Sequence, residues 1–230
     1  MTAITFALPD ESRAFTARLR HAGSEGGFLL GNLGASEIAL FHTGMGAARV
    51  RERLPAFLRA GRFRCLVAAG YAGGLDATLR AGEAVLGYNL SDPALLDRAR
   101  KTLGCRSVRF ASAAEPLETP EAKTAFFRQT AAAAVDLETE TIAALCREHG
   151  LPMLALRVIS DTATETLPVP FHVCFDAATE RPRIGSLLGF LARRPRRIPA
   201  FLQFVRRIRQ ARATLADALE RLVTGEEERG

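Results

Sequence analysis

Stretches of apolar sequence alternate with amphipathic stretches along most of this chain, and that alternation constrains the fold more than any other feature. Eight apolar runs have the length and the side-chain types of β-strands, and many of them lack a strict alternation with polar residues. Strands that are covered on both faces have this pattern. The runs are residues 2–8, 27–33, 36–42, 63–69, 83–89, 106–111, 131–136 and 152–159.

Helical patterns fill the intervals between these runs. They lie at residues 10–21, 46–60, 93–103, 119–129 and 139–149. Thr119 and Pro120 form an N-cap and first-turn pair, and Gly150, followed by Pro152, ends the last helix. Strands that alternate with helices predict an α/β fold, and we expect a single domain built on a twisted, mixed central sheet flanked by helices.

The composition is that of an ordinary globular protein. Of 230 residues, 48% are hydrophobic and 24% are charged, which excludes disordered and collagen-like chains. The cysteines at positions 65, 105, 146 and 174 form neither a C-x-x-C pair nor a zinc-ligand pattern. No segment has the features of a signal peptide or of a membrane-spanning helix. We therefore expect no disulfide framework, no metal and no cofactor, and a cytoplasmic location.

Positive charge is concentrated near the C-terminus. Ten arginines and no acidic residue lie from Arg181 to Arg212, and removing these ten charges from the formal net charge of +6 leaves −4 for the rest of the chain. Apolar residues lie among these arginines, so we expect basic amphipathic helices. Three roles are open: a cover for the sheet with a solvated basic face, contact with an anionic membrane surface or lipid-like substrate, and nucleic-acid binding, for which no recognised module is present.

Candidate functional residues gather where the predicted strands end, which is where α/β sheets usually bind ligands. These places are Asp10 with Glu11, residues 43–46, residues 70–75, Glu138 with the preceding Asp136, and Ser160 with Asp161. Each has a structural alternative, because acidic residues at strand ends often cap helices and glycine clusters often form turns.

The Thr43-Gly44-Met45-Gly46 segment begins like a dinucleotide-binding fingerprint, since glycines let the backbone approach a phosphate. The spacing then fails. Arg49 occupies the position of the third glycine, and no ordered strand-helix-strand unit with an acidic residue about 20 positions later follows. A nicotinamide cofactor is therefore not expected, and a tight turn before a helix is the alternative.

Taken in chain order, these segments resemble the nucleoside phosphorylase and nucleosidase superfamily, and in pattern the methylthioadenosine/S-adenosylhomocysteine nucleosidases. The resemblance covers residues 1–165. It is carried by residues 7–11 (ALPDE, the family's acidic loop), 43–46 (TGMG, its Ser/Thr-Gly-x-Gly turn), 70–75 (GYAGGL, its G-[ST]-A-G-G-L loop), 135–138 (VDLE, its V-x-M-E segment) and 157–161 (RVISD, its R-x-I-S-D segment).

The resemblance implies cleavage of the N-ribosidic bond of a purine nucleoside, most often one that carries adenine and a 5′-substituent. It implies that Asp161 protonates purine N7, that Glu11 activates water and that Glu138 holds the ribose hydroxyls. It also implies substrate contacts from Gly44, Gly70, Tyr71, Gly73, Leu137 and Ser160. The chemistry is consistent, because the leaving purine needs an acid and the cationic sugar needs nearby negative charge. Asp161 must carry a proton to act, which burial near the substrate favours.

Phosphate-using relatives place an arginine two residues before the first glycine of the 70–75 loop, where this chain has Ala68. A phosphate dianion without an arginine loses its strongest charge-assisted hydrogen bonds. Hydrolysis is therefore favoured over phosphorolysis, and the alternative is that Arg49 or Arg51 supplies the missing cation.

Three departures from the family pattern concern specificity. Tyr71 replaces a small hydroxyl residue, Leu137 replaces a methionine, and residues 112–117 lack the aromatic that stacks on adenine. These departures support a second hypothesis, in which the protein keeps the fold and binds nucleosides or a membrane but catalyses no reaction.

The C-terminal segment, residues 166–230, is expected to be a basic helical extension packed on the same domain. Parts of it resemble the hopanoid-associated branch, namely residues 167–170, 175–176, 181–183, 191–195 and 198–202. That resemblance implies adenosylhopane as a candidate substrate beside methylthioadenosine and S-adenosylhomocysteine. The resemblance of residues 1–165 to the family implies a homodimer. If the basic segment contacts an anionic membrane, we expect the protein to be peripheral on the inner membrane face.

Overall fold

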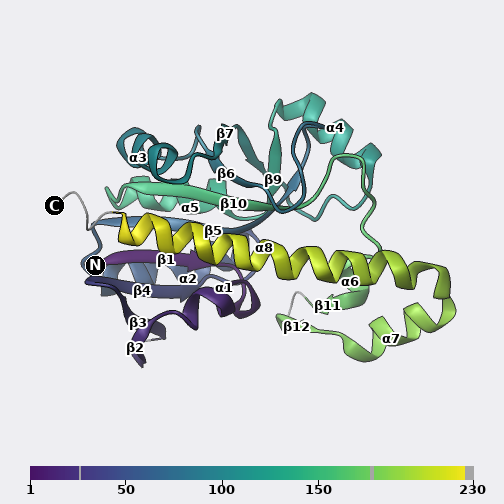
Figure 1. Ribbon diagram of the computed structural model, residues 1–230, viewed down its shortest axis with the longest axis horizontal. Helices are drawn as coiled ribbons and strands as arrows, with labels where there is room; N and C mark the ends of the chain where they lie inside the picture. The colour runs from purple at the N-terminus through teal and green to yellow at the C-terminus, as the bar shows by residue number, and fades with distance from the viewer. Residues whose placement is uncertain (26, 177–178, 226–230) are drawn as a thin grey trace.

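The structure, a computed structural model, describes residues 1–25, 27–176 and 179–225. Its centre is a mixed sheet with helices on both faces (Figure 1). The strand order along the main path is β2-β3-β4-β1-β5-β10-β6-β7, while β9 pairs with the end of β5 and with β8. The strands are β1 (Thr2–Phe6), β2 (Arg20–Glu25), β3 (Phe28–Leu33), β4 (Ser36–His42), β5 (Cys65–Gly74), β6 (Ala84–Gly87), β7 (Arg106–Val108), β8 (Phe110–Ser112), β9 (Ala134–Asp136) and β10 (Met153–Asp161).

Helices connect these strands and complete the C-terminal part. Those of the first 165 residues are α1 (Pro9–Thr16), α2 (Ala47–Ala60), α3 (Pro93–Leu103), α4 (Pro120–Thr130) and α5 (Thr139–Glu148). Beyond them lie α6 (Phe171–Cys174), the short strands β11 (Phe175–Asp176) and β12 (Arg181–Pro182), α7 (Ile184–Arg193), the 3-10 turn η1 (Pro195–Arg197) and α8 (Ile198–Thr224).

The core is built on the parallel strands β1, β5 and β10, whose apolar side chains are buried on both faces. On one face, Leu54 and Phe57 of α2 and Ile142 of α5 pack against the sheet. On the other face the C-terminal half of α8 packs beside α1, with residues such as Leu215 and Leu219 wholly buried. This two-sided covering explains why the predicted strands lack polar alternation.

The predicted single α/β domain with a mixed sheet is confirmed, and most predicted elements lie within a few residues of the observed ones. Some element boundaries were predicted incorrectly, and the first correction concerns residues 10–21. A helix was expected over 10–21, whereas α1 ends at Thr16 and the chain forms strand β2 from Arg20. Strand β2 pairs antiparallel with β3, so its hydrogen bonds come from a tertiary partner rather than from local sequence.

The second correction concerns residues 70–75, which were expected to form a loop after a strand. Strand β5 instead continues to Gly74, because Gly73 and Gly74 pair antiparallel with β9 and Gly73 also pairs with Asp161 of β10. The predicted strand 131–136 is also shorter in the structure, where β9 begins at Ala134. Helix α4 extends to Thr130, and Ala131, which has a φ of 53°, is its C-cap.

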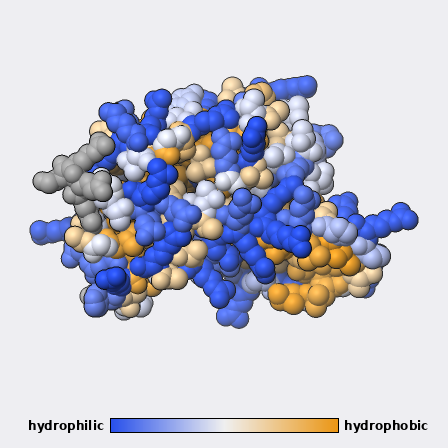
Figure 2. Space-filling model, viewed as in Figure 1, coloured by the Kyte–Doolittle hydropathy of each residue, from blue (hydrophilic) through white to orange (hydrophobic). Residues whose placement is uncertain are grey.

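The residues from α7 through the first turns of α8, 184–202, project beyond the sheet, and we call them the arm (Figure 1). Hydrophobic surface gathers over α7 (Figure 2). The large apolar side chains that the arm exposes are Ile184, Leu188, Ile198 and Leu202. Within the described ranges, no helix has the length and hydropathy needed to span a bilayer.

Candidate active site

A pocket of about 230 Å³ lies where several strands end. Strand β5 contributes Tyr71 and Gly73, and β10 contributes Ser160 and Asp161. The segments that follow β1, β4 and β9 supply most of the other walls, and the C-terminal elements close one side. The remaining lining residues are Ala7, Glu11, Met45, Ala72, Glu115, Pro116, Leu117, Val135, Asp136, Leu137, Glu138, Leu167, Phe171, Phe204 and Ile208.

Glu11 reaches the pocket from the first turn of α1. Its Oε2 accepts hydrogen bonds from the backbone N–H groups of Ala7 at 3.0 Å and Leu8 at 3.3 Å. Gly70 lies directly beneath the carboxylate, since a Cβ at that position would be 3.5 Å from Oε2. Burial raises the pKa of Glu11 to about 7, although the nearby Arg157 and the backbone donors partly oppose the shift. A carboxyl with this pKa can exchange protons near neutral pH.

Glu138 enters from the other side, at the N-cap of α5. Its Oε1 accepts a 2.6 Å hydrogen bond from the backbone N–H of Gly46, which has a φ of +84° that favours glycine. Burial, together with the negative charges of Asp136 and Glu11, raises the pKa of Glu138 to about 8, against the backbone hydrogen bond from Gly46 and the nearby Arg157. The Glu11 carboxylate therefore makes Glu138 harder to ionise.

A second cavity of about 10 Å³ is lined by Glu11 and Glu138 together, with Thr5, Thr43 and Gly70 among its other walls. That volume is close to the minimum that a single water molecule requires, and the walls offer several polar groups. Glu11 and Glu138 therefore line both the large pocket and a second cavity that is about the size of one water molecule.

Asp136 has a different role from Glu138, although the two are separated by one residue. Its Oδ2 accepts from Arg157 Nε at 2.9 Å and from the Thr139 hydroxyl, and its Oδ1 accepts from the Ser112 hydroxyl at 2.7 Å. Arg157 also donates to the Ala68 carbonyl at 2.5 Å. These contacts occupy Asp136 in a buried ion pair beneath the site, so Glu138 is the carboxylate that remains for a substrate.

Asp161 lies further along β5 than Glu11, beside Gly73 and not Gly70, and is only 8% exposed. Ser160 donates from Oγ to its Oδ1 at 2.5 Å. The ammonium of Lys123, a buried residue of α4, donates to its Oδ2. A Cβ at Gly73 would lie 3.4 Å from Oδ2, so glycine there leaves room for the carboxylate. Asp161 is thus held as a carboxylate paired with a cation, whereas the resemblance requires it to deliver a proton.

The predicted site residues fall into three groups. Glu11, Tyr71, Gly73, Leu137, Glu138, Ser160 and Asp161 line the large pocket. Gly70 lines the smaller cavity only. Gly44 lines neither of them, and Met45 represents that turn in the large pocket. The Glu180 carboxylate lies over Gly44, and the substrate contact expected from Gly44 stays a prediction.

The sequence analysis missed the residues that come from distant parts of the chain. Phe171 of α6 and Phe204 and Ile208 of α8 supply apolar side chains to the pocket, where residues 112–117 offer no aromatic. Lys123 was also missed. Its only sequence signal is rarity, because it is one of two lysines among 31 basic residues.

Comparison with known proteins agrees with this geometry. The family model described as Phosphorylase superfamily matches residues 87–184. The chain has the phosphorylase-superfamily fold. The resemblance to nucleoside phosphorylases and nucleosidases is therefore confirmed for the fold, and the hopanoid-associated branch is not distinguished.

Solved structures match over nearly the whole chain. The methylthioadenosine/S-adenosylhomocysteine nucleosidase of Neisseria meningitidis, in complex with methylthio-immucillin-A, has a TM-score of 0.72 and 19% identity, covering 97% of this chain and 98% of that one. S-adenosylhomocysteine nucleosidase of Streptococcus pyogenes has a TM-score of 0.74 and 17% identity over 97% and 96%. Futalosine hydrolase of Helicobacter pylori has a TM-score of 0.70 and 18% identity over 97% of each chain. At these identities the likeness concerns the fold.

Proposed function

We propose that this protein hydrolyses the N-ribosidic bond of a purine nucleoside that carries a 5′-substituent, with adenine as the preferred base. The observation that carries the proposal is the convergence of Glu11, Glu138 and Asp161 on one pocket, from three separate elements. The similar folds that bind adenine or nucleoside analogues support it.

Each carboxylate has a distinct task in this reaction. Asp161 delivers a proton to purine N7 while the electron pair of the C1′–N9 bond moves into the base. Glu138 accepts hydrogen bonds from the ribose hydroxyls and stabilises the positive charge that develops on the sugar. Glu11 takes a proton from the attacking water, a task that its pKa of about 7 suits. We propose that Leu137, Tyr71, Gly70, Gly73 and Ser160 complete the substrate contacts.

Water is the proposed nucleophile because the pocket lacks a cation for phosphate. Among the described residues, no arginine or lysine lines the larger cavity. Arg49 and Arg53 both form ion pairs with Glu180, at 3.9 Å and 2.9 Å, and Arg51 is exposed. Phosphorolysis would therefore require a rearrangement of Glu180.

The 5′-substituent is proposed to be apolar. Leu167, Phe171, Phe204 and Ile208 form an apolar wall of the pocket, and Phe204 and Ile208 come from the helix that continues into the arm. This wall accommodates a methylthio group, and its position next to the arm suits a longer apolar group such as that of adenosylhopane. S-adenosylhomocysteine, with a charged amino acid at this position, fits the same wall less well.

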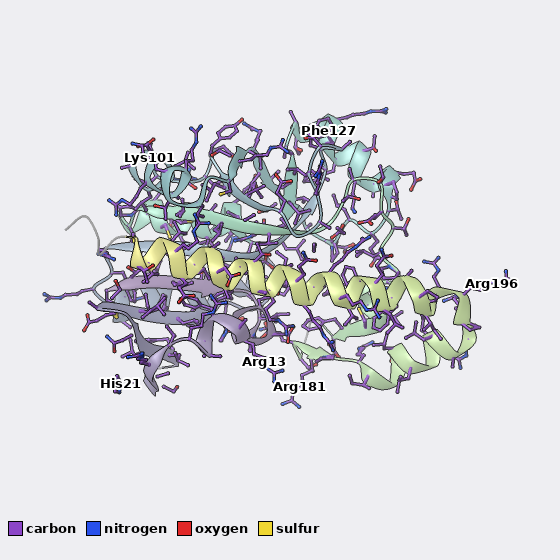
Figure 3. All side chains as sticks on the ribbon, viewed as in Figure 1. Arg13, His21, Lys101, Phe127, Arg181 and Arg196 are labelled. Atoms are coloured by element: carbon purple, nitrogen blue, oxygen red, sulfur yellow. The ribbon has the colours of Figure 1, made fainter. Side chains whose placement is uncertain are left out.

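The arm is proposed to contact an anionic membrane surface. Its four exposed apolar side chains lie next to exposed arginines at 193, 194, 196 and 197, and the labelled Arg196 lies at the outer end of the arm (Figure 3). Arg183, Arg207 and Arg212 are different, because each is paired with an acidic residue. Arg194 stacks on the Phe190 ring and Arg197 donates to the Pro168 carbonyl, but no ion pair between the four arginines of the arm and an acidic residue is found in the described part of the chain. Apolar side chains flanked by such arginines suit the boundary between lipid headgroups and acyl chains.

A cytoplasmic, peripheral location on the inner membrane face follows from this proposal, and we propose a homodimer by family resemblance. Residues 166–230 are proposed to serve as an extension of the 1–165 core rather than as a separate domain. The alternative of a catalytically silent nucleoside-binding protein is decided by the following assay.

The test is a panel of nucleosides with purified full-length protein: adenosine, methylthioadenosine, S-adenosylhomocysteine and a 5′-long-alkyl adenosine. We expect free adenine and free sugar in phosphate-free buffer, at rates that phosphate does not change. Ribose 1-phosphate among the products would show that the reaction is phosphorolysis and not hydrolysis. Binding of nucleosides without release of base would establish the silent binding protein and contradict the proposal.

Sedimentation with liposomes tests the arm. We expect the protein to bind anionic and not neutral liposomes, more weakly in high salt, and we expect Arg→Glu changes at 193, 194, 196 and 197 to abolish binding. The matched control reverses four exposed arginines elsewhere, Arg51, Arg59, Arg128 and Arg147, which gives the same net charge. Equal loss in both variants would mean that total charge, and not the arm, attracts the protein.

A further inference from the structure

Lys123 is buried more completely than any charged side chain near the pocket, with 1% of its surface exposed. It lies in the first turn of α4, after the Thr119 N-cap and Pro120. It is not among the residues that line the pocket, so it lies behind Asp161 and not against a bound substrate.

The Lys123 ammonium has three protons, and each has an acceptor. Besides Asp161 Oδ2, they are the backbone carbonyl oxygens of Thr162 at 2.6 Å and Glu165 at 3.0 Å. A buried ammonium is tolerated only when its charge and its donors are satisfied in this way. The carbonyls come from the loop that follows β10, so Lys123 ties α4 to both Asp161 and this loop.

This arrangement answers a chemical problem that the proposed function creates. A carboxylate paired with an ammonium is ionised and has no proton for purine N7. The ion pair as a whole does hold an extra proton, on Lys123 Nζ, within hydrogen-bond reach of Asp161 Oδ2. A lysine can release its proton, whereas an arginine at the same place could not.

We propose that Lys123 is a positioning residue for Asp161 and the store of the proton that Asp161 passes to the base, an inference that rests on the proposed function. As the C1′–N9 bond breaks, its electron pair enters the purine. Lys123 Nζ passes a proton to Asp161, which passes it on to N7, so that Lys123 becomes a neutral amine and Asp161 remains a carboxylate. The water proton goes to Glu11, and after product release solvent reprotonates Lys123 while Glu11 loses its proton to solvent.

Nuclear magnetic resonance of protein labelled with ¹⁵N-lysine observes the pair without turnover. The chain has only two lysines, so the side-chain spectrum contains Lys123 and Lys101, which is largely exposed on α3 and serves as an internal reference (Figure 3). At pH 7 we expect two ammonium signals, of which only that of Lys123 shifts in Asp161→Asn. A Lys123 signal that this substitution leaves unchanged would overturn the ion pair.

Kinetics test the proton store. We expect Lys123→Met to lower kcat on a purine nucleoside by about 10²-fold with KM changed only a few-fold, because the general acid is lost and the walls of the pocket are kept. Lys123→Arg keeps the charge but not the transferable proton, so we expect no more than partial rescue. Full rate in Lys123→Arg, or a kcat within threefold of wild type in Lys123→Met, would overturn the proposal.

Two controls separate this role from a structural one. Arg207→Met breaks the Arg207–Glu165 ion pair, which holds the same loop, but leaves the Lys123–Asp161 pair in place. Lys101→Met removes the other lysine, and we expect near-normal kcat in both variants. A loss in Arg207→Met equal to that in Lys123→Met would assign the effect to loop order. If the wild-type protein cleaves no nucleoside, the proposed function fails, while the spectrum still decides whether the pair exists.

Discussion

The carboxylates at the two ends of the pocket have opposite electrostatic surroundings. At one end burial raises the pKa of Glu11 to about 7, and burial with the nearby charges of Asp136 and Glu11 raises the pKa of Glu138 to about 8. At the other end Asp161 is paired with the Lys123 ammonium. The first end is therefore suited to accepting a proton or meeting a cation, and the second to supplying a proton to a base. In the proposed reaction, this difference separates the sugar end, with Glu11 and Glu138, from the purine end, with Asp161.

The largest effect is expected at the sugar end. Glu11→Gln keeps the size and part of the hydrogen bonding of Glu11 but cannot take a proton from water, so we expect kcat to fall by roughly 10³-fold. Binding of free adenine serves as the control and should remain within a few-fold. A rate within tenfold of wild type would mean that another group activates the water.

The corresponding change at the purine end is Asp161→Asn. It removes proton delivery and leaves Lys123 without its anionic partner, so we expect a loss on the order of 10²-fold or more in kcat with most of the binding retained. Steady-state kinetics on the same nucleoside measure both variants. Near wild-type turnover would show that the purine leaves without help from this end.

The sequence could place both ends because carboxylates that follow parallel strands meet at one edge of a sheet. Glu11 and Asp161 stand at such positions, on or after strands parallel to β5, whereas Glu138 follows β9, which pairs antiparallel with the end of β5. It could not place Lys123, which reaches Asp161 from a helix 38 residues earlier in the chain, because the rotation of that helix about its axis is set by packing. Nor could it show that Glu180 covers Gly44 or that α8 supplies Phe204, since both contacts join distant segments.

A smaller effect concerns the apolar wall. Phe204→Ala removes a pocket-lining ring that belongs to neither end, so we expect kcat/KM for a 5′-alkyl adenosine to fall about tenfold while adenosine is affected less than threefold. Phe127→Ala, an exposed phenylalanine on α4 outside the pocket, is the matched control. Equal losses on both substrates would mean that this wall does not contact the 5′-substituent.

The last effect is on stability and not on turnover. A carboxyl whose pKa is higher in the folded than in the unfolded state binds a proton more tightly when folded, so its contribution to the free energy of unfolding falls as pH rises from about 4.5 towards 8. Glu138→Gln removes this penalty. We expect the variant to gain roughly 1 to 3 kcal/mol relative to wild type between pH 5 and pH 8, measured by urea unfolding. The same difference at both pH values would contradict the shifted pKa.

The most direct test of the roles assigned to the two ends of the pocket uses a leaving group that needs no protonation. A p-nitrophenyl riboside with the same 5′-substituent as the nucleoside releases a stable phenolate, so only the sugar end should matter for its hydrolysis. We predict that Asp161→Asn and Lys123→Met hydrolyse it within about threefold of wild type, while Glu11→Gln loses activity on it and on the nucleoside alike. Equal losses on both substrates in all three variants would contradict the assignment of the two ends.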